Sequence, residues 1–512
     1  MNRPTAIYSA AQVRALDALE IEHRHVPSFT LMTRAAESAL KILRARWPEA
    51  RRIVVICGGG NNGGDGYVLA RLARESGLDA RVVAATPPEK LGGDASRAQR
   101  DWLAAGGSTV LATAIKGGES PLATVLGGAD VIVDGLLGIG LAGPLRADVL
   151  AVIRATNASH RPVLALDVPS GIDADTGAVH DGAVRAEVTV CFVAFKSGLF
   201  LGAGPEHAGV VLLEDLGVVA PQTPQFSPLM HRISETELAS RLSPRARDSH
   251  KGTHGRVLVV GGGPGMPGAL RLAGEAALRV GAGLVTVAGA PENLVPVTAS
   301  RPELIYLPTL APESIGEALR AAAVIAIGPG LGTSALAQDL WKKVIGVSDK
   351  PVILDADALN LLARAPVRLP ANWVLTPHPG EAARLLETDT AAVQSDRLGA
   401  VREINARYGA VAVLKGAGTL VAWCHDGAVE ISICERGNPG MATAGMGDVL
   451  TGVIAGVLAQ LPDGSTTGGG SALAARLGVL IHALAGDSAA AGGQRGLMAS
   501  DVIGELRGWV NP

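Results

Sequence analysis

The segment of this sequence best suited to chemistry is GNPGMATAGMGDVLTG, at residues 437–452. A glycine-rich run that leads into a helix presents free backbone N–H groups and the positive end of the helix dipole to an anion. The N–H groups around residues 444–447 would form an anion hole for a transferring phosphoryl group. Asp448, at the start of the expected helix, could accept the proton of an attacking hydroxyl group. A helix cap could also use an acid here, but capping alone requires no such run of glycines.

A second candidate phosphate loop is KGAGT, at residues 415–419, which follows an expected strand at 411–414. Its lysine supplies charge, its glycines permit a close backbone approach and its threonine supplies a hydroxyl group. His378, between two prolines, is held rigidly, which favours a binding role. Asp355 and Asp357 could lie near the phosphates or could cap the helix expected at Ala358, and the sequence leaves both possibilities open. Three more motifs of this half follow expected strands: GGGPGMPGA (261–269), GPGLG (328–332) and TPHPGE (376–381).

The first half carries GGGNNGGDG at residues 58–66, between an expected strand (53–57) and an expected helix (66–76). Glycines here would let the backbone turn with positive φ and approach a ligand closely. The helix N-terminus would offer N–H groups to a phosphate, and Asn61, Asn62 and Asp65 add polar side chains. A tight strand-to-helix turn is the alternative, but such a turn needs fewer glycines and amides.

Two aspartates, Asp134 and Asp167, each end an expected strand of the same half. Ligands of open parallel sheets bind beyond the carboxyl ends of the strands, so these residues and the 58–66 segment predict one site. Oxygens of Asn62, Asp134 and Ser170 could together hold a hard cation.

The elements that must position these residues are short apolar strands alternating with helices, which predicts parallel sheets covered on both faces. The first half is therefore expected to be a doubly wound α/β domain of Rossmann type, 1–218. A proline-rich stretch, 219–235, is the expected linker, and a second, unrelated α/β domain occupies 236–512. Expected strands are 53–57, 81–85, 131–134, 163–167, 188–193 and 210–213, then 257–260, 284–288, 324–327, 352–354, 373–375 and 411–414, with a hairpin at 420–423 and 429–433 and helices from Gly447 onward.

The composition excludes several classes of protein. A net charge of −3 with no sustained basic block, and 3% aromatic residues, argue against nucleic-acid binding. The four cysteines are far apart, which favours reduced thiols over disulfides or zinc. The apolar stretches 449–461 and 472–485 are too short or too interrupted for a membrane span and are expected to be buried helices. Because the N-terminus has no signal-peptide pattern, a cytoplasmic location is expected.

The motifs NNGGDG, the loop after Asp134 and DVPSG resemble the epimerase domain of NAD(P)H-hydrate repair enzymes. The resemblance implies a potassium ion at Asn62, Asp134 and Ser170. The family usually has Thr where this chain has Ile139, which loses one hydroxyl contact. Epimerisation at the hydrated ring carbon needs transient loss of hydroxide or ring opening. An acid–base carboxylate near that carbon would serve, and Asp167 is our hypothesis for it. The implied hydrate contacts are Asn61, Asn62, Gly63, Gly64, Asp65, Gly138, Ile139, Gly140, Leu141, Ala142, Gly143, Pro144 and Asp167.

The second half resembles the ribokinase-like superfamily and, within it, the ADP/ATP-dependent NAD(P)H-hydrate dehydratases. GGGPGMPGALRLAGEAALRVGAGLV, GPGLG, TPHPGE, KGAGT and GNPGMATAGMGD carry the resemblance. Met446 stands where the family often has Thr, a change that leaves a backbone anion hole intact. The implied hydrate contacts are Ala269, Gly330, His378 and Asp448, and the implied nucleotide contacts are Lys415, Gly416, Ala417, Gly418, Thr419 and Gly447.

Together these resemblances predict a metabolite-repair enzyme that acts on hydrated NADH and NADPH (NADHX and NADPHX). The first half would interconvert the R and S epimers, and the second would dehydrate the S epimer by phosphorylating its hydroxyl group and eliminating phosphate. ADP or ATP would be the co-substrate with Mg²⁺, and a homo-oligomer without nucleic-acid or membrane partners is expected. The alternative is a ribokinase-like kinase of a vitamin precursor, carrying a non-catalytic ligand-binding module in its first half.

Overall fold

A computed structural model describes residues 5–112, 121–140, 143–346, 349–461 and 468–511. The chain divides into two compact units, Ala6–Leu229 (the N-terminal unit) and Met230–Pro512 (the C-terminal unit). The division falls inside the 219–235 stretch. That stretch is more ordered than a simple tether, because it contains the buried Phe226 and the strand β10 (Met230–Arg232). The functional boundaries at 218 and 236 remain a prediction.

The N-terminal unit is built on a sheet of parallel strands in the order β4-β3-β2-β5-β6-β7-β9. The strand order reverses between β2 and β5, so the sheet is doubly wound, as predicted. The strands are β2 (Arg52–Cys57), β3 (Asp79–Ala84), β4 (Thr109–Leu111), β5 (Val131–Gly135), β6 (Val163–Leu166), β7 (Val188–Phe192) and β9 (Val210–Glu214). Outside this sheet, β1 (Ala6–Tyr8) pairs in parallel with β8 (Phe195–Lys196).

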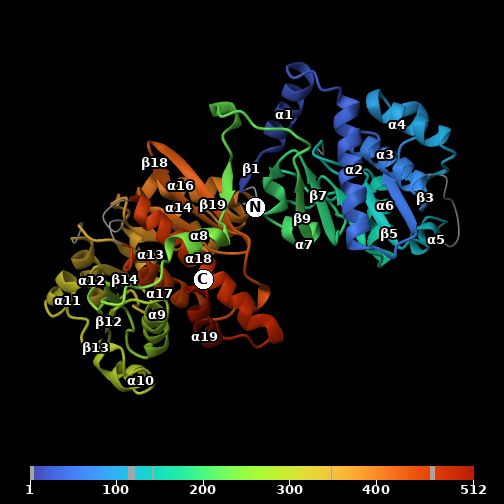
Figure 1. Cartoon of the computed structure of the whole chain (residues 1–512). Coiled ribbons are helices and arrows are strands. Elements are labelled where there is room, and N and C mark those ends of the chain that lie inside the picture. The colour runs from blue at the N-terminus through green and yellow to red at the C-terminus, as the bar shows by residue number, and fades with distance from the viewer. Residues whose placement is uncertain (1–4, 113–120, 141–142, 347–348, 462–467, 512) are drawn as a thin grey trace. The chain divides into compact units, whose positions relative to one another are not determined.

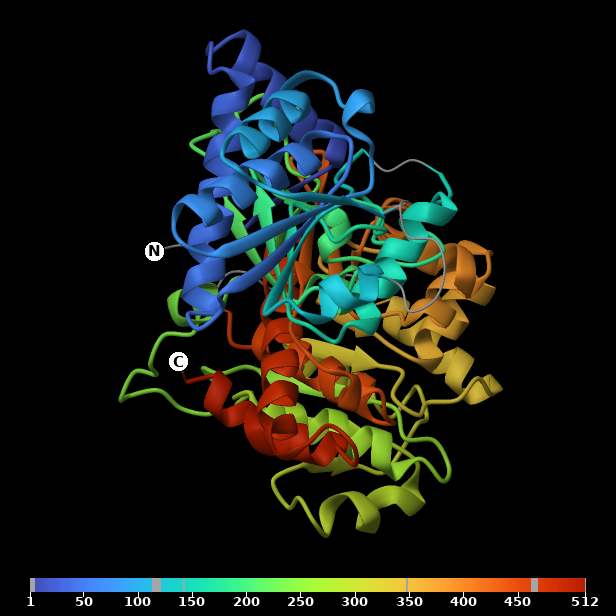
Figure 2. The ribbon, with the colours of Figure 1, turned by 90° about the vertical axis from the view of Figure 1, so that its right-hand side faces the viewer.

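Helices cover both faces of this sheet because side chains alternate along each strand. Val55 packs with helices α1 to α4, whereas Ile56 packs with α5 and α6. Figure 2 shows the blue helices and the teal helices on opposite sides of the sheet. The helices are α1 (Ala10–Glu22), α2 (Ser28–Arg46), α3 (Asn61–Glu75), α4 (Gly93–Ala104), α5 (Pro121–Gly127), α6 (Ala147–Ala158) and the short α7 (Gly204–Ala208).

The C-terminal unit has a mixed sheet in the order β13-β12-β11-β14-β15-β16-β17-β18-β19-β10 (Figure 1). Neighbours are parallel from β13 to β17, whereas β17, β18 and β19 are antiparallel, which confirms the predicted hairpin. The strands are β11 (Arg256–Val260), β12 (Leu284–Ala288), β13 (Ile305–Leu307), β14 (Val324–Ile327), β15 (Val352–Leu354), β16 (Val374–Leu375), β17 (Val411–Leu414), β18 (Thr419–His425) and β19 (Ala428–Cys434).

One face of this sheet packs against α9, α17, α18 and α19 in a single apolar core. Helix α18, with 22 residues, is longer than the sequence predicts, and it is long and apolar enough to cross a membrane. Its apolar window is nevertheless 78% buried inside the unit, as in the predicted core helix. The helices are α8 (Glu235–Arg241), α9 (Pro267–Arg279), α10 (Leu294–Thr298), α11 (Gly316–Ala321), α12 (Ala335–Ile345), α13 (Asp357–Arg364), α14 (Pro379–Leu386), α15 (Thr390–Ser395), α16 (Arg397–Tyr408), α17 (Met446–Leu458), α18 (Gly468–Ala489) and α19 (Ala499–Trp509).

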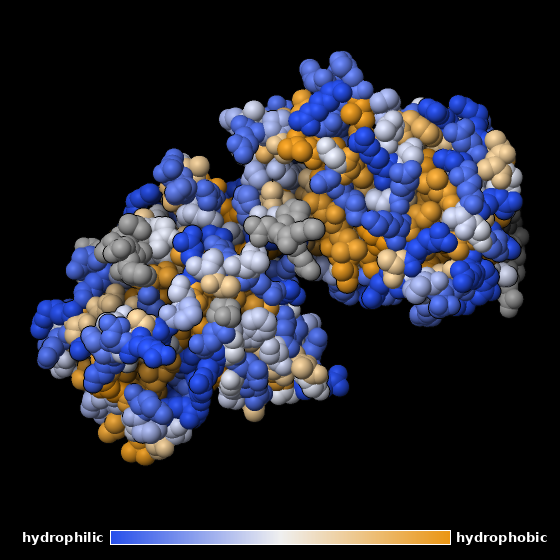
Figure 3. Space-filling model, viewed as in Figure 1, coloured by the Kyte–Doolittle hydropathy of each residue, from blue (hydrophilic) through white to orange (hydrophobic). Residues whose placement is uncertain are grey.

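The surface of the N-terminal unit includes apolar residues on the face shown in Figure 3, around helix α2. On the edge strand β9, Val210 and Leu212 are also exposed. The homo-oligomer expected from the sequence remains a prediction.

Candidate functional sites

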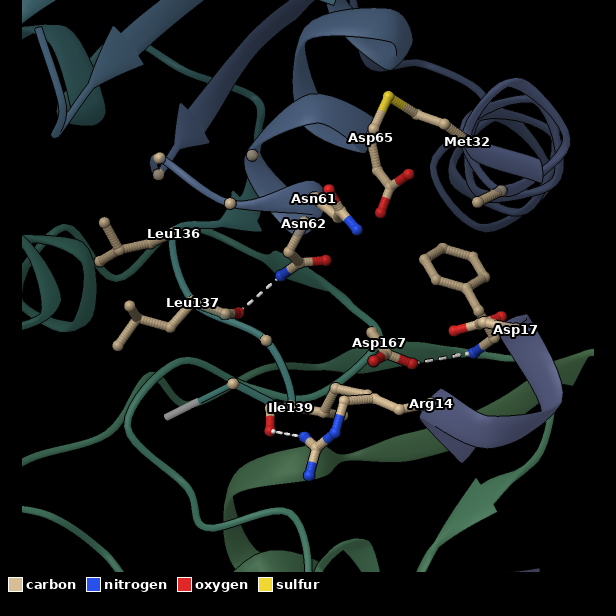
Figure 4. A pocket seen from close by; sticks show the side chains of 18 of the residues that line it. Arg14, Asp17, Met32, Asn61, Asn62, Asp65, Leu136, Leu137, Ile139 and Asp167 are labelled. Atoms are coloured by element: carbon tan, nitrogen blue, oxygen red, sulfur yellow. Dashed lines mark hydrogen bonds between the residues drawn. The ribbon is translucent and has the colours of Figure 1, made fainter. Parts of the chain in front are cut away.

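The N-terminal unit contains a cavity of about 700 Å³ at the point where the strand order reverses. Its walls come from α1, α2, the β2–α3 junction, the loop after β5 and the ends of β6 and β7 (Figure 4). Of the predicted contacts, the described residues that line it are Asn61, Asn62, Gly63, Asp65, Gly138, Ile139, Gly140, Pro144 and Asp167. The predicted contacts Leu141 and Ala142 lie outside the described residues.

The glycines of the 58–66 segment act differently from the prediction. Helix α3 begins at Asn61 rather than near Gly66, so NNGGDG forms its first turns, and these glycines do not have positive φ. Gly58 and Gly63 are needed instead because a side chain at either position would collide with neighbouring backbone. A Cβ on Gly58 would lie 1.9 Å from the Leu136 carbonyl oxygen, and one on Gly63 would lie 2.1 Å from the Gly58 carbonyl oxygen. The close approach of the β2–α3 and β5 loops therefore fixes the floor of the cavity.

Asn62, Asp134 and Ser170 are brought together beside this floor. The Ser170 hydroxyl donates to Asp134 Oδ1 (2.6 Å) and its N–H donates to Oδ2 (2.8 Å). The Asn62 amide nitrogen donates to the carbonyl oxygen of Leu137 (Figure 4) and to that of Leu166. Its Oδ1 atom is buried without a partner among the described residues. Burial raises the pKa of Asp134, and the hydrogen bonds from Ser170 oppose that shift. An unpartnered amide oxygen beside a carboxylate and carbonyl oxygens fits a hard cation.

A charged cluster faces the cavity from the other side. Lys196, at the end of β8, is buried and forms an ion pair with Asp167, which also accepts a hydrogen bond from the Phe192 N–H (3.1 Å). Asp17 from α1 and Asp65 from α3 point into the same space (Figure 4). Burial raises the pKa of Asp17 to about 6, Lys196 lowers it and Asp167 raises it. Burial, with Asp167 and Asp17 nearby, raises the pKa of Asp65 well above its usual range.

The C-terminal unit places Asp448 in the first turn of helix α17. Gly445 caps this helix with a φ of 87°, a conformation that favours glycine, so the chain can enter the helix directly from the motif. The first N–H groups of a helix have no partner inside it, and here they belong to Met446, Gly447 and Asp448 itself. Burial and the nearby Asp355 raise the pKa of Asp448 to about 7, and Lys415 lowers it.

Lys415 connects the two phosphate-loop candidates. Its Nζ donates to Asp355 Oδ1 (2.8 Å) and lies 3.8 Å from Glu381 Oε2. A Cβ on Gly447 would lie 3.2 Å from the same Nζ. Asp355 also accepts from the Thr451 hydroxyl in α17 (2.8 Å). These contacts decide the question that the sequence leaves open for Asp355, because it belongs to the charged centre and does not cap a helix.

Asp357 has a different role, since it is the first residue of α13 and accepts the Gly332 N–H (2.8 Å), which ties down the GPGLG loop.

His378 is the N-cap residue of α14. Its Nδ1 accepts the N–H groups of Gly380 (3.0 Å) and Glu381 (3.3 Å), so the ring proton lies on Nε2 when the imidazole is neutral. Nε2 lies 3.4 Å from Glu381 Oε1. Desolvation, Lys415 and Arg384 lower the pKa of His378, whereas burial raises the pKa of Glu381 to about 7. The side chain of His378 is 51% exposed, which leaves room for a ligand contact.

Two buried side chains donate hydrogen bonds to carbonyl oxygens of the glycine-rich loops. Asn293 donates to the carbonyl oxygens of Gly262 (2.7 Å) and Gly263 (3.0 Å). Arg397, at the start of α16, donates to those of Lys415 (3.4 Å) and Gly418 (3.2 Å). With its carbonyl oxygens turned inward, the 415–419 loop can present N–H groups outward. Desolvation lowers the pKa of Arg397 to about 10.

Ala269 and Gly330 are neighbours, since a Cβ on Gly330 would lie 3.2 Å from that of Ala269. The two predicted hydrate contacts therefore belong to one surface. In the 415–419 loop, the Thr419 hydroxyl donates to the Gly416 carbonyl oxygen (3.0 Å).

Sequence reasoning missed Asp17, Lys196, Glu381, Asn293 and Arg397 as site residues. Lys196 follows a buried apolar strand, where a lysine is unusual unless it is paired, and Glu381 lies within TPHPGE. These two carried a signal. The others lie on helices or loops whose proximity to the site only the fold reveals.

Comparisons with known proteins match both halves. A family model described as YjeF-related protein N-terminus matches residues 28–198, and one described as NAD(P)H-hydrate dehydratase matches residues 257–507. The chain is 44% identical to a bifunctional NAD(P)H-hydrate repair enzyme of Coxiella burnetii, over 99% of this chain and 100% of that protein. It is 41% identical to the Escherichia coli enzyme of the same description, over 99% of this chain and 95% of that one.

Among solved structures, an ADP/ATP-dependent NAD(P)H-hydrate dehydratase from Bacillus subtilis, co-crystallised with ATP and Mg²⁺, is 29% identical with a TM-score of 0.48. The match covers 54% of this chain and 96% of that chain.

Proposed function

The chain belongs to the family of bifunctional NAD(P)H-hydrate repair enzymes, and we propose that its two centres divide the family's chemistry between them. The N-terminal cavity interconverts the R and S epimers of NADHX and NADPHX. The C-terminal centre dehydrates the S epimer to NADH or NADPH at the expense of ADP or ATP. The kinase alternative is not retained, because full-length relatives share the repair function in both halves.

The observation that carries the dehydratase proposal is the position of Asp448. Its carboxyl group lies at a glycine-capped helix start, in one charged cluster with Lys415, Asp355 and Glu381. The N–H groups of the helix start and the Lys415 ammonium group can stabilise negative charge on a transferring phosphoryl group. A carboxylate within that anion hole is where a hydroxyl group must lose its proton.

The reaction proceeds in two stages. Asp448 takes the proton of the ring hydroxyl group while the hydroxyl oxygen attacks the terminal phosphorus of the nucleotide. The bond between that phosphorus and the rest of the nucleotide breaks. The nitrogen lone pair of the ring then expels phosphate, which is a far better leaving group than hydroxide. Loss of a proton from the adjacent ring carbon restores the dihydropyridine. Magnesium bound with the nucleotide would neutralise phosphate charge during transfer.

The nucleotide is proposed to bind at Lys415–Thr419 and Gly447, and the hydrate at Ala269, Gly330, His378 and Asp448. The inward carbonyl oxygens of Lys415 and Gly418 support this assignment, and the N–H groups of Gly416, Ala417 and Gly418 can bind phosphate, whereas the Lys415 N–H donates to the Pro377 carbonyl oxygen (2.9 Å). ADP is the preferred phosphate donor in this proposal.

For the epimerase, the proposed contacts are those of the cavity wall, and potassium is the proposed ion at Asn62, Asp134 and Ser170. The buried, unpartnered Oδ1 of Asn62 supports this choice. A bound potassium ion would supply a fixed positive charge at this junction of loops. Asp167 stays the sequence-based hypothesis for the acid–base group. A cytoplasmic homo-oligomer also remains part of the proposal.

The test supplies purified protein with each separated NADHX epimer, with and without ADP or ATP. The S epimer plus nucleotide should regain the near-ultraviolet absorbance of reduced nicotinamide, and either epimer without nucleotide should become a mixture. A stable phosphorylated product that never yields NADH would contradict the dehydratase proposal. Epimers that stay separate at the rate of the enzyme-free blank would contradict the epimerase proposal.

A further inference from the structure

Helix α1 forms a wall of the N-terminal cavity, although it lies outside the residues 28–198 matched by the family model. Val13, Arg14, Asp17 and Ile21 of this helix line the cavity. Two contacts hold the helix there. Arg14 Nη1 donates to the Ile139 carbonyl oxygen (3.0 Å), and the Ala10 N–H donates to Asp175 Oδ1 (2.7 Å). The helix is therefore joined to two loops that surround the site.

Asp17 is the acidic residue that this helix contributes to the cavity. Figure 4 shows its carboxyl group pointing into the same space as those of Asp65 and Asp167. Among the described residues it accepts no hydrogen bond, so its oxygens are available to a ligand. The charged groups that face it are Lys196, Asp167 and Asp65, with Arg14 exposed on its own helix. Burial raises the pKa of Asp17 to about 6, close to the range in which an acid–base catalyst works.

Asp167 is in a different state. Its Oδ1 accepts from both the Lys196 ammonium group and the Phe192 N–H. This carboxyl oxygen is thus already occupied by two donors, whereas the Asp17 carboxyl group accepts none from the described residues.

Asp65, by contrast, also accepts no hydrogen bond from the described residues, but its surroundings disfavour the anion more strongly than those of Asp17. Burial and the charges of Asp167 and Asp17 raise the pKa of Asp65 well above its usual range. Asp17 is therefore the cavity carboxyl group that is neither paired with a lysine, as Asp167 is, nor as strongly disfavoured as an anion as Asp65 is.

We propose that Asp17 is a catalytic residue of epimerisation, which gives a proton to the departing ring hydroxyl group and recovers it when water returns. The inference rests on the epimerase function proposed above. It assigns the proton transfer to a helix outside the matched family segment, in place of the sequence-based hypothesis for Asp167, and leaves to Asp167 the pairing with Lys196.

The step balances as follows. Neutral Asp17 protonates the hydroxyl oxygen, the carbon–oxygen bond breaks, and water leaves. The ring-nitrogen lone pair forms a carbon–nitrogen double bond, which gives a planar iminium cation. Water then adds to either face, the double-bond electrons return to nitrogen, and the proton lost by water goes to the Asp17 carboxylate. The carboxylates of Asp17 and Asp167 stabilise the transient cation, because opposite charges attract strongly in a cavity shielded from water.

The experiment compares epimerisation by the full-length wild type, Asp17→Asn and Glu22→Gln. Glu22 is an exposed acid on the same helix and does not line the cavity, so its substitution is the matched control. Each protein receives one purified NADHX epimer without nucleotide, and the enzyme-free rate is subtracted. For Asp17→Asn we expect epimerisation to fall by about 100-fold or more, as for loss of a general acid, whereas Glu22→Gln stays within twofold. Dehydratase activity towards the S epimer with ADP stays unchanged in all three.

Two further measurements separate catalysis from folding. Asp17→Glu, which restores the carboxyl group, should recover part of the rate, and the thermal unfolding of Asp17→Asn should match that of wild type. Wild-type epimerisation should also decline as the pH rises through about 6, and Asp17→Asn should lose this dependence. If wild type epimerises and Asp17→Asn stays within threefold of it, this inference is wrong and the epimerase function stands. If wild type itself shows no epimerisation, the proposed function fails instead.

Discussion

Each unit places a buried lysine against an aspartate at the carboxyl end of a parallel strand. Lys196 pairs with Asp167 after β6, and Lys415 pairs with Asp355 after β15. Each pair also lies near a carboxyl group that accepts no hydrogen bond from the described residues, Asp17 in one unit and Asp448 in the other.

The surroundings of the two free carboxyl groups differ. Asp448 lies in the first turn of a glycine-capped helix, whose N–H groups attract negative charge. Asp17 faces other carboxyl groups across a cavity, which attract positive charge. The comparison teaches that the neighbouring dipoles and charges, rather than the titrating side chain, decide whether a phosphoryl anion or a ring cation is stabilised.

Removing the carboxylate from the anion hole should give the largest effect. For Asp448→Asn we expect dehydration of the S epimer to fall by about 1,000-fold, within the range for a lost general base. Epimerisation should stay within twofold, measured by chromatography of the two epimers. The control is Glu505→Gln, an exposed acid on α19. Dehydration within threefold of wild type in Asp448→Asn would remove Asp448 from the mechanism.

Removing the hydrogen bonds that hold the 415–419 loop should give the next largest effect. Arg397→Met removes the donors to the Lys415 and Gly418 carbonyl oxygens, which should raise the KM for nucleotide while kcat changes less. Hydrogen bonds from charged groups contribute about 1.5–3 kcal/mol, so a rise of roughly 10- to 100-fold is expected. Arg407→Gln, which removes a half-buried arginine paired with Glu387 at the other end of the same helix, is the control. An unchanged nucleotide KM would show that the loop needs no support from Arg397.

The two activities should respond to pH in opposite directions. Asp448 must be ionised to accept a proton, so dehydratase kcat/KM should rise as the pH increases through about 7. Asp17 must be protonated to donate, so epimerase kcat/KM should decline as the pH increases through about 6. Because Asp448 and Glu381 interact, the midpoint of the dehydratase pH profile reflects both carboxyl groups rather than Asp448 alone. Parallel pH profiles for the two activities would contradict the distinction drawn between the centres.

The smallest expected effect concerns the cation site. Replacing tetramethylammonium chloride with potassium chloride should raise the unfolding temperature of the N-terminal unit by a few degrees, since binding to the native state adds about 1 kcal/mol at tenfold the dissociation constant. Asn62→Ala, which lacks the unpartnered oxygen, should lose this response. Equal potassium responses in Asn62→Ala and wild type would place the ion elsewhere.

The sequence predicts the parallel strands and both glycine-rich helix starts because periodicity and glycine motifs are local features. It misjudges the 58–66 glycines, since their need for space depends on the Leu136 carbonyl oxygen, which comes from a distant loop. The strands β4, β10 and β13 are missed because they are short and mostly not buried, so they lack the apolar run that marks the equally short β15. The sequence does not identify Asp17 as a site residue, because its helix carries no motif and only tertiary packing brings it to the cavity.

The central claim is that the chain holds two chemically independent centres. Complementation between two variants, each lacking one of the two activities, tests this claim most directly. The R epimer of NADHX is given with ADP to Asp448→Asn, to Asp17→Asn and to an equal mixture of both, and the near-ultraviolet absorbance of NADH is followed. We predict little NADH from either variant alone and recovery approaching the wild-type yield in the mixture. A mixture that produces no more NADH than the single variants would contradict the account.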